Sequence, residues 1–276
     1  MDQQKTKKIA FLGAGNMSEA IIKGILSAQL FPAEVIFASD ISSERLNMLK
    51  NRYHIQTTLS NEDAAEEGDI IILGVKPSVV ERLLHQVCPL LKGKLVISVA
   101  AGVPIAKLAE TLDQSSAVIR VMPNAAALVL AGASVLSPGP DVSHEQLSDG
   151  LAIFDAIGKS WVLEESLLDA VTGLSGSGPA FVMVAIEAMT EGGVKCGLPY
   201  ETALALSAQT VLGAGKWLIE SCEHPAKLKD FVASPGGTTI AGLHQLEIGG
   251  FRGALISAVE AAAKRSKELG AQKKED

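Results

Sequence analysis

The chain has 276 residues, 47% of them hydrophobic, which is enough for one large domain or two of ordinary size. Its formal net charge is −7 and its isoelectric point lies near 5.3. The sequence also lacks a basic stripe with interleaved aromatic residues, so the composition argues against a nucleic-acid partner. No run reaches the ~18 uninterrupted apolar residues of a membrane span. The polar, basic N-terminus lacks the apolar core of a signal peptide, so we expect no membrane partner and a cytoplasmic protein.

The cysteines and histidines do not form a recognisable reactive or metal-binding pattern. Cys88, Cys196 and Cys222 are far apart and fit neither a disulfide framework nor zinc spacing. All three fall in apolar, helix-like segments, so we expect buried, inert thiols. None of the five histidines stands in a Ser/His/Asp or His-x-x-x-His arrangement. The sequence therefore supports neither a metal nor an acyl-transfer nucleophile.

Short β-branched runs alternate with helical stretches through the first part of the chain. The runs are continuously apolar, as expected where helices cover both faces of a parallel sheet. We predict strands at residues 8–13, 35–39, 70–75, 95–100 and 118–122, and helices at 16–28, 42–51, 78–89 and 105–112. Two weaker strands, at 133–136 and 161–163, lie on either side of a helix at 143–157. This rhythm predicts an α/β fold, with a Rossmann-type, doubly wound and mostly parallel sheet over residues 1–163.

After about Glu164 the β-branched runs stop, and helices separated by Gly and Pro follow. Pro179 and Pro199 each stand at the opening of a long Ala- and Leu-rich helix. Residues 181–191 and 201–220 are apolar on more than one face and must be buried, yet a domain of about 110 residues has little interior to hide them. We therefore expect residues 164–276 to be an all-helical dimerisation domain of an obligate homodimer.

The first strand leads into a Gly-x-Gly turn and then a helix, and the turn consists of Gly13, Ala14, Gly15, Asn16 and Met17. The first glycine permits the tight turn, and the second lets a pyrophosphate approach the backbone. The helix N-terminus adds free N–H groups and a positive dipole. Ser18 replaces the usual third glycine and is small enough for close contact between helix and strand. The pattern predicts dinucleotide binding, and the alternative is an ordinary strand-to-helix turn.

Asp40 follows the second strand, where an acidic residue binds the hydroxyls of the adenosine ribose in dinucleotide-binding folds. This position favours NADH, because a carboxylate repels a 2′-phosphate. However, Ser39, Ser42, Ser43 and Arg45 surround it and could cradle that phosphate. The alternative role for Asp40 is to cap the helix that follows.

Further strand ends carry small or helix-opening residues: Gly74-Val75-Lys76-Pro77, Ala100-Ala101-Gly102 and Met122-Pro123-Asn124. Ligands of open parallel sheets lie beyond the carboxyl ends of the strands. We therefore expect the Val75 and Lys76 backbone to face the cofactor and Ala100–Gly102 to adjoin the nicotinamide. Each segment alone could be a plain turn, but their common edge favours a cofactor site.

Two loops rich in Ser, Gly and Pro lead into helices of the second part of the chain, at residues 172–179 and 234–239. Such loops offer N–H groups and hydroxyls at a helix N-terminus, which suits a carboxylate. Taken singly, each is better explained as a capped turn between helices.

Taken together, these motifs resemble the pyrroline-5-carboxylate reductase family, in order and over essentially the whole chain. The most specific matches are the loops Gly176-Ser177-Gly178-Pro179 and Ser234-Pro235-Gly236-Gly237-Thr238-Thr239. The resemblance implies a Rossmann domain followed by a helical dimerisation domain, and dimers that sometimes assemble into larger rings. It also implies reduction of L-1-pyrroline-5-carboxylate to L-proline, the final step of proline biosynthesis.

The resemblance further implies roles at matching positions. The Gly13–Met17 turn, Asn61, Val75–Pro77 and Ala100–Gly102 would contact the dinucleotide, and Thr172 and Ser175 would lie near its nicotinamide end. The substrate carboxylate or ring nitrogen would be bound by Ser234, Gly237, Thr238 and Thr239. The sequence departs from the family at Asp40, where many members have a small polar residue. The implied preference for NADPH is therefore open at this position, and we expect NADH to be accepted as well.

The implied reaction agrees with the residues available. A cyclic imine is electrophilic, more so once protonated, so the enzyme must place the hydride donor, hold the carboxylate and support protonation of the nitrogen with a hydroxyl. Thr239 is the candidate for that hydroxyl.

Two other interpretations remain open at this point. A β-hydroxyacid-type NAD(P)-dependent dehydrogenase shares the domain plan but needs a helix lysine over its substrate, and Lys195, Lys216 and Lys227 lack a suitable neighbouring Asn or Gly-Gly pair. The other is a non-catalytic NAD(P)-binding sensor. Oxidation of the cofactor in the presence of pyrroline-5-carboxylate separates the three.

Overall fold

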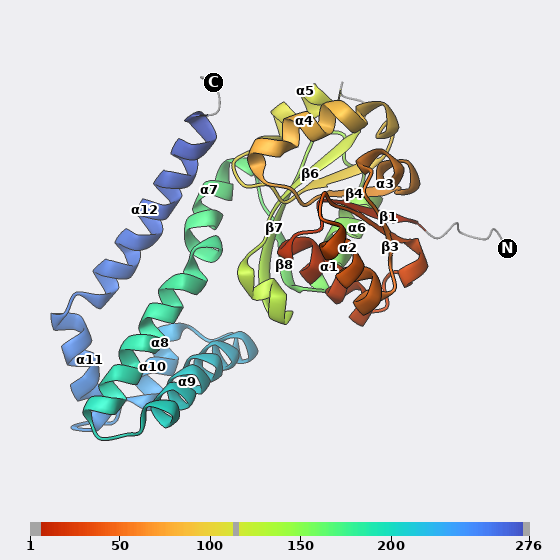
Figure 1. The fold of residues 1–276 in the computed structure, drawn as a ribbon. Coiled ribbons are helices and arrows are strands. Elements are labelled where there is room, and N and C mark those ends of the chain that lie inside the picture. Colours follow the sequence, from red (N-terminus) through yellow and green to blue (C-terminus); the bar gives the residue numbers. More distant parts are fainter. Residues whose placement is uncertain (1–6, 113–115, 273–276) are drawn as a thin grey trace. The chain divides into compact units, whose positions relative to one another are not determined.

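The computed structural model describes residues 7–112 and 116–272, with side chains as far as residue 270. The chain divides into two compact units, which are described separately (Figure 1). The first unit is Met1–Gly176 together with Ala262–Asp276, and the second is Ser177–Ala261.

The first unit is built on an eight-stranded sheet with the order β3-β2-β1-β4-β5-β6-β7-β8. The strands are β1 (Ile9–Leu12), β2 (Ile36–Ser39), β3 (Gln56–Thr58), β4 (Ile70–Leu73), β5 (Leu95–Ser98), β6 (Ala117–Met122), β7 (Gly132–Pro138) and β8 (Gly158–Val162). All neighbouring strands pair in parallel except β6 and β7, which are antiparallel. The predicted doubly wound, mostly parallel sheet is therefore confirmed.

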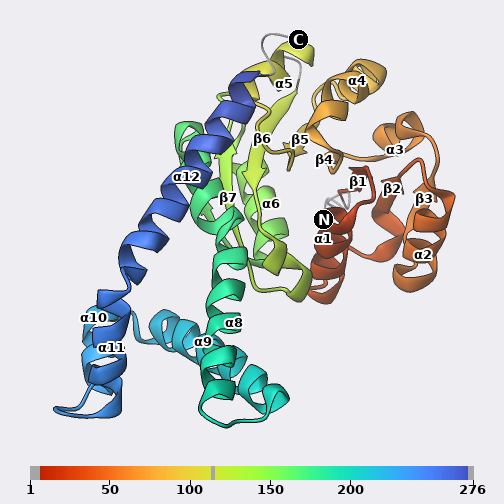
Figure 2. The same cartoon turned by 60° about the vertical axis from the view of Figure 1, so that its left-hand side comes forward.

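Helices cover both faces of this sheet (Figure 2). On one face, Ile9 and Phe11 of β1 pack with apolar residues of α1, α2 and α6. On the other, Ala10 and Leu12 pack with residues of α3, α4 and α5. These helices are α1 (Asn16–Ser27), α2 (Ser43–Tyr53), α3 (Asn61–Glu67), α4 (Pro77–Val87), α5 (Ile105–Thr111) and α6 (His144–Asp155). Alternate residues of β1 thus serve opposite faces, which explains why the central strands are apolar throughout.

The first unit ends with a short helix, α7 (Leu168–Val171), which continues into a π-helical turn, Thr172–Gly176. The last turns of the C-terminal helix α12 (Phe251–Gln272) also belong to this unit. Ser266 of α12 donates a hydrogen bond to Asp169 of α7 over 2.7 Å, which ties the two helices together.

The second unit is entirely helical and has almost no core of its own. It contains α8 (Gly178–Lys195), α9 (Tyr200–Ser221), α10 (Pro225–Val232), α11 (Thr238–Ile248) and the beginning of α12. Its buried residues are Thr190, Ala203 and Ser207, only one of them hydrophobic. Large apolar side chains are exposed in the single chain, among them Met183 and Val184 of α8. The predicted apolar helices are present, but one chain does not bury them.

The run Glu165–Lys195 is long and apolar enough, by length and composition alone, to cross a membrane, with a mean hydropathy of 1.3. It contains α7, the π-helical turn and α8, whose exposed apolar face belongs to the second unit described above. The same surface suits contact with another subunit, a point taken up below.

Three sequence-based details need correction. Cys196 and Cys222 are exposed in the single chain, because both lie at helix C-termini and not on packed faces. Pro199 is the N-cap of α9 and precedes its first turn. The sequence did not predict β3 and α3. Strand β3 has only three residues, and both elements are composed mostly of polar residues.

Candidate active site

The strand registers bring the predicted cofactor loops to one edge of the sheet. Leu12 of β1 pairs with Ser39 of β2 on one side and with Leu73 of β4 on the other, and Leu73 pairs with Ser98 of β5. These residues end their strands, so the loops that follow all leave the sheet at the same level. The chain order reverses on either side of β1, which makes this edge the topological switch point where dinucleotides bind in such sheets.

The Gly-rich turn after β1 is tightly packed beneath the edge. Gly13 has a φ of +95°, and a Cβ atom there would lie 2.6 Å from Val75 Cγ1. Ser18 is fully buried and donates a hydrogen bond to the Gly13 carbonyl over 2.6 Å. A Cβ atom on Gly74 would overlap Ser18 Oγ, so the serine fills the space that the third glycine leaves in the usual pattern. The expectation that Ser18 permits close contact with the neighbouring strand end is confirmed.

The same turn is open on its outer side. A Cβ atom on Gly15 would meet only the Gly74 carbonyl oxygen, at 3.8 Å, and Gly15 and Asn16 are exposed. No side chain among the described residues caps the N-terminus of α1, which begins at Asn16. Uncapped N–H groups beside an open glycine form the kind of cradle that accepts a pyrophosphate. The residues present therefore fit a dinucleotide.

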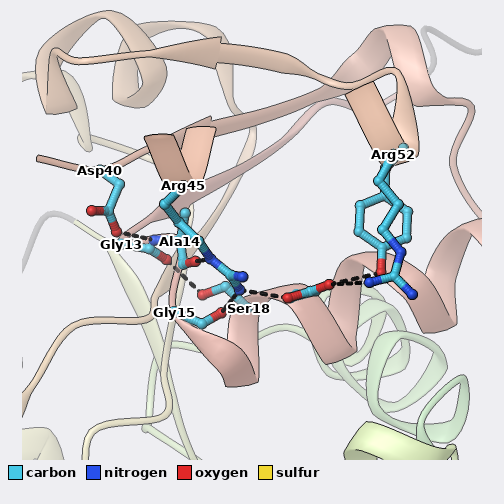
Figure 3. Close-up of polar contacts among 9 residues, drawn as sticks. Gly13, Ala14, Gly15, Ser18, Asp40, Arg45 and Arg52 are labelled. Atoms are coloured by element: carbon cyan, nitrogen blue, oxygen red, sulfur yellow. Dashed lines mark hydrogen bonds and ion pairs between the residues drawn. The ribbon is translucent and has the colours of Figure 1, made fainter. Parts of the chain in front are cut away.

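Asp40 is bound to this turn (Figure 3). Its carboxylate accepts hydrogen bonds from the Ala14 N–H over 2.8 Å and from the Ser42 N–H over 3.0 Å. The N-cap of α2 is Ser42, whose hydroxyl accepts from the Arg45 N–H, so the alternative role of Asp40 as the cap is wrong. Asp40 instead places a carboxylate directly beside the dinucleotide turn.

Arg45 supports the turn from the other side (Figure 3). Its guanidinium donates to the carbonyl oxygens of Ala14 and Gly15 over 2.7 and 3.2 Å and forms an ion pair of 2.6 Å with Glu19. Burial alone would raise the pKa of the Glu19 carboxyl, but hydrogen bonds from Arg45 and Tyr53 outweigh it and lower the pKa below the ordinary 4.5. Because the Glu19 pKa is lower in the folded protein than in the unfolded chain, the ion pair with Arg45 stabilises the fold at any pH above the ordinary carboxyl pKa. This stabilisation is lost as the pH falls through the lowered pKa of Glu19. At neutral pH the Arg45–Glu19 ion pair is therefore intact, and Arg45 stabilises the Gly-rich turn.

The remaining predicted cofactor residues lie at the same edge. Asn61, the first residue of α3, accepts a hydrogen bond over 2.8 Å from the buried Ser39 hydroxyl at the end of β2. Val75 contacts the Gly-rich turn, Lys76 is the exposed N-cap of α4, and Pro77 opens that helix. After β5, Ala100 is buried, Ala101 is exposed and Gly102 has a φ of +72°. The backbone of Gly102 passes within van der Waals distance of Gly270 near the end of α12.

Thr172 and Ser175 lie on the π-helical turn of the first unit. The Thr172 hydroxyl donates to the Leu168 carbonyl over 2.8 Å, and the Ser175 hydroxyl donates to the Val171 carbonyl over 3.1 Å. A hydroxyl that donates to the backbone still offers lone pairs to a ligand. Sequence reasoning did not predict the π-helix, although such turns are frequent at functional sites.

The loop predicted to bind the substrate carboxylate lies in the second unit. The Gly237 N–H donates to the Ser234 carbonyl over 3.0 Å, and Gly236 has a φ of +67°. This turn leads into α11, which begins at Thr238 and whose N-terminus is capped by no side chain among the described residues. Its first N–H groups are therefore available to an anion. Thr239, in the first turn of α11, is only partly exposed.

Known proteins resemble both parts of the chain. The sequence family described as pyrroline-5-carboxylate reductase dimerisation matches residues 165–269. The family described as NADP oxidoreductase, coenzyme F420-dependent, matches residues 8–102, which include the Gly-rich turn.

Individual relatives match nearly the whole chain. A pyrroline-5-carboxylate reductase of Methanosarcina acetivorans is 46% identical over 96% of this chain and 99% of its own. The structure of such a reductase from Coxiella burnetii has a TM-score of 0.92 at 34% identity, covering 96% of this chain and 99% of its own. A pyrroline carboxylate reductase of Plasmodium falciparum, solved with NADP bound, has a TM-score of 0.86 at 33% identity and covers 96% of this chain and 98% of its own.

Proposed function

The chain belongs to the pyrroline-5-carboxylate reductase family, and on that premise we propose that it reduces L-1-pyrroline-5-carboxylate to L-proline with NAD(P)H. The single observation that carries the proposal is the match of almost the full chain, both domains in order, to enzymes of this name. The same observation disfavours a β-hydroxyacid-type dehydrogenase, the alternative left open by the sequence.

The first unit holds the cofactor in this proposal. Its pyrophosphate is bound by the N–H groups at the start of α1, beside the open Gly15. Asp40 and Asn61 would hold the adenosine half of the cofactor, and Val75–Pro77 and Ala100–Gly102 would hold the nicotinamide half, since all of them follow strands that end at this edge. The bound NAD(P)H supplies the hydride.

The chain's own residues bind and orient the imine. The N-terminus of α11, with Ser234, Gly237 and Thr238, binds the substrate carboxylate without a formal positive charge. The Thr239 hydroxyl supports protonation at the ring nitrogen, and Thr172 and Ser175 adjoin the nicotinamide end. Binding the imine carbon close to the hydride donor makes the transfer effectively unimolecular, which lowers its barrier. No strong base is needed, because the imine is already electrophilic.

The proposal is tested by mixing the purified protein with pyrroline-5-carboxylate and NADPH or NADH. We expect the cofactor to be oxidised only when the imine is present and proline to accumulate in equal amount. Cofactor binding without oxidation would favour a sensor, and oxidation with a β-hydroxyacid alone would favour the dehydrogenase.

The helical second unit, within residues 164–276, mediates formation of a homodimer in this proposal, and dimers of this kind can assemble further into rings. Support comes from the almost coreless second unit and from the dimerisation family that matches it. The same subunit contact explains the apolar run Glu165–Lys195 without a membrane. The enzyme acts in the cytoplasm, and its three free cysteines fit a reducing compartment.

The dimer has a direct test. Obligate interfaces of this kind commonly bury more than ~2,000 Å². We expect sedimentation at micromolar concentration to show dimers or larger assemblies and no folded monomer. Val184 of α8 is 65% exposed in the single chain, so Val184→Glu should dissociate the assembly or prevent folding. Leu30→Glu, at a 41% exposed position of the first unit, should leave the assembly intact. A stable folded monomer of the parental protein would overturn the dimer.

Asp40 should influence the choice of cofactor. Its carboxylate lies beside the dinucleotide turn, where it repels a 2′-phosphate and accepts from ribose hydroxyls. Asp40→Ser should therefore raise the NADPH/NADH ratio of kcat/KM by about tenfold or more, which corresponds to ~1.4 kcal/mol. The exposed Asp141→Ser makes the same change elsewhere and should leave the ratio unaltered. An unchanged ratio in Asp40→Ser would mean that this carboxylate serves only to hold the Ala14 and Ser42 backbone.

A further inference from the structure

The π-helical turn Thr172–Gly176 rests on the end of β6. Met122, the last residue of β6, packs against a small apolar cluster of Val135, Leu168 and Val171. A Cβ atom on Gly176 would lie 2.8 Å from Met122 Cε, so the glycine permits this close approach. Apolar packing is non-directional, so it holds the π-helical turn near the end of β6 but does not fix the exact position or orientation of the turn.

Asn124 supplies the directional contact. Its Nδ2 atom donates a hydrogen bond to the Ser175 carbonyl over 3.0 Å, and its Oδ1 atom accepts one from the Ala133 N–H over 3.1 Å. Ala133 lies at the start of β7, which runs antiparallel to β6 and therefore begins beside the end of β6. One partly buried amide thus joins the end of β6, the start of β7 and the π-helical turn.

Both sides of the amide are used, so its orientation is determined. The N–H of Ala133 requires an acceptor and the carbonyl of Ser175 requires a donor, and an amide offers both at every pH. Residue 179, four positions after Ser175, is a proline without an N–H, so an α-helical backbone bond could not satisfy the Ser175 carbonyl, and the Asn124 side chain binds it instead.

We propose that Asn124 is a positioning residue that fixes the π-helical turn, and through it the Thr172 and Ser175 hydroxyls, at the nicotinamide end of the site. This inference rests on the proposed reductase function. Both hydroxyls donate to backbone carbonyls, so each oxygen keeps lone pairs with which to accept from a ligand. A protonated imine nitrogen and a nicotinamide carboxamide are both donors, so acceptors held at a fixed place would orient either group.

The decisive variant is Asn124→Asp, which has nearly the same shape and keeps an acceptor for the Ala133 N–H. An ionised carboxylate would oppose the Ser175 carbonyl, whereas a protonated carboxyl would donate to it as the amide does. We expect kcat to fall by about 10- to 100-fold at neutral pH, as is usual for a small misplacement of reacting groups, with cofactor Kd unchanged. The ratio of variant to parental kcat should then rise as the pH is lowered from about 8 to about 5. The Ala133 N–H favours the ionised carboxylate, but partial burial and the facing Ser175 carbonyl oppose it more strongly and raise the aspartate pKa above its ordinary value of about 3.9.

Two further variants make the outcome unambiguous. Asn124→Ala cannot donate at any pH, so its kcat ratio should stay low and flat with pH. Asn51→Asp makes the same chemical change at an exposed position of α2 and should match the parental enzyme throughout. Activity losses that are equal and independent of pH in Asn124→Asp and Asn124→Ala would overturn the positioning role, as would parental kcat in either.

The outcome is separable from failure of the reductase assignment. A parental protein that does not reduce pyrroline-5-carboxylate would overturn the proposed function itself. Amide hydrogen exchange would still report on the contact, since Asn124→Ala should speed exchange in residues 172–177 and leave residues 61–67 unchanged. Unchanged exchange in residues 172–177 would show that Asn124 does not hold the turn.

Discussion

Gly15→Val should abolish cofactor binding while leaving the fold intact. The position has φ −68° and ψ −174°, an extended conformation that a β-branched residue adopts easily. A Cβ atom there meets nothing closer than the Gly74 carbonyl oxygen at 3.8 Å, so the protein itself has room for the side chain. That room is where the pyrophosphate is proposed to lie. We expect the Kd for NADPH and NADH to rise by on the order of 100-fold or more, which corresponds to about 2.7 kcal/mol.

Calorimetry and thermal unfolding together check this result. Ala152→Val introduces a valine at an exposed position of α6 and should change neither binding nor the fold. Gly13→Val is the opposite comparison, because its φ of +95° and its contact with Val75 predict a loss of stability as well. Normal cofactor binding by a folded Gly15→Val protein would place the dinucleotide site elsewhere.

Thr239→Ala should lower kcat/KM by on the order of 10- to 1000-fold, the usual cost of losing one hydrogen bond made in the transition state. Thr239 lies in the first turn of α11, beside the uncapped N–H groups proposed to bind the substrate carboxylate. The substitution deletes the hydroxyl and leaves the backbone of the loop unchanged. Cofactor Kd should barely change, because Thr239 is assigned to the substrate side.

Thr239→Val tests the same hydroxyl with a side chain of closer shape and should lose a similar amount of activity. Thr111→Ala removes a threonine hydroxyl on α5 that donates to the Lys107 carbonyl, and it should have parental kinetics. If both Thr239 variants turn over pyrroline-5-carboxylate at the parental rate, this hydroxyl is structural.

Most of the sheet could be predicted because its signals are local. Strands such as β4 (Ile70–Leu73) are continuously apolar, and the Gly13–Met17 turn directly follows the first strand, β1 (Ile9–Leu12). The antiparallel pairing of β7 could not be predicted, since it depends on the loop Pro123–Ala131 turning the chain back along β6. β3 is too short and too polar to give a periodic signal.

The polar contacts of the site were less accessible to sequence reasoning. Asp40 was singled out, but the Ala14 N–H that its carboxylate binds lies 26 residues away in the chain. The sequence places Arg45 among candidate phosphate ligands, whereas in the structure its guanidinium binds the turn carbonyls and Glu19. The contact between Asn124 and Ser175 spans 51 residues and depends on a π-helical turn that no periodicity predicts. Sequence motifs identify such residues, but their hydrogen-bond partners depend on the tertiary structure.

The proposed reaction transfers hydride from a nicotinamide cofactor to the imine carbon of pyrroline-5-carboxylate. The most direct measurement supplies NADPH or NADH carrying deuterium at the transferable position and analyses the product by mass spectrometry. We predict L-proline with a single deuterium, located at the former imine carbon, formed in step with cofactor oxidation. Unlabelled proline, or no proline from the folded protein with either cofactor, would contradict the assignment.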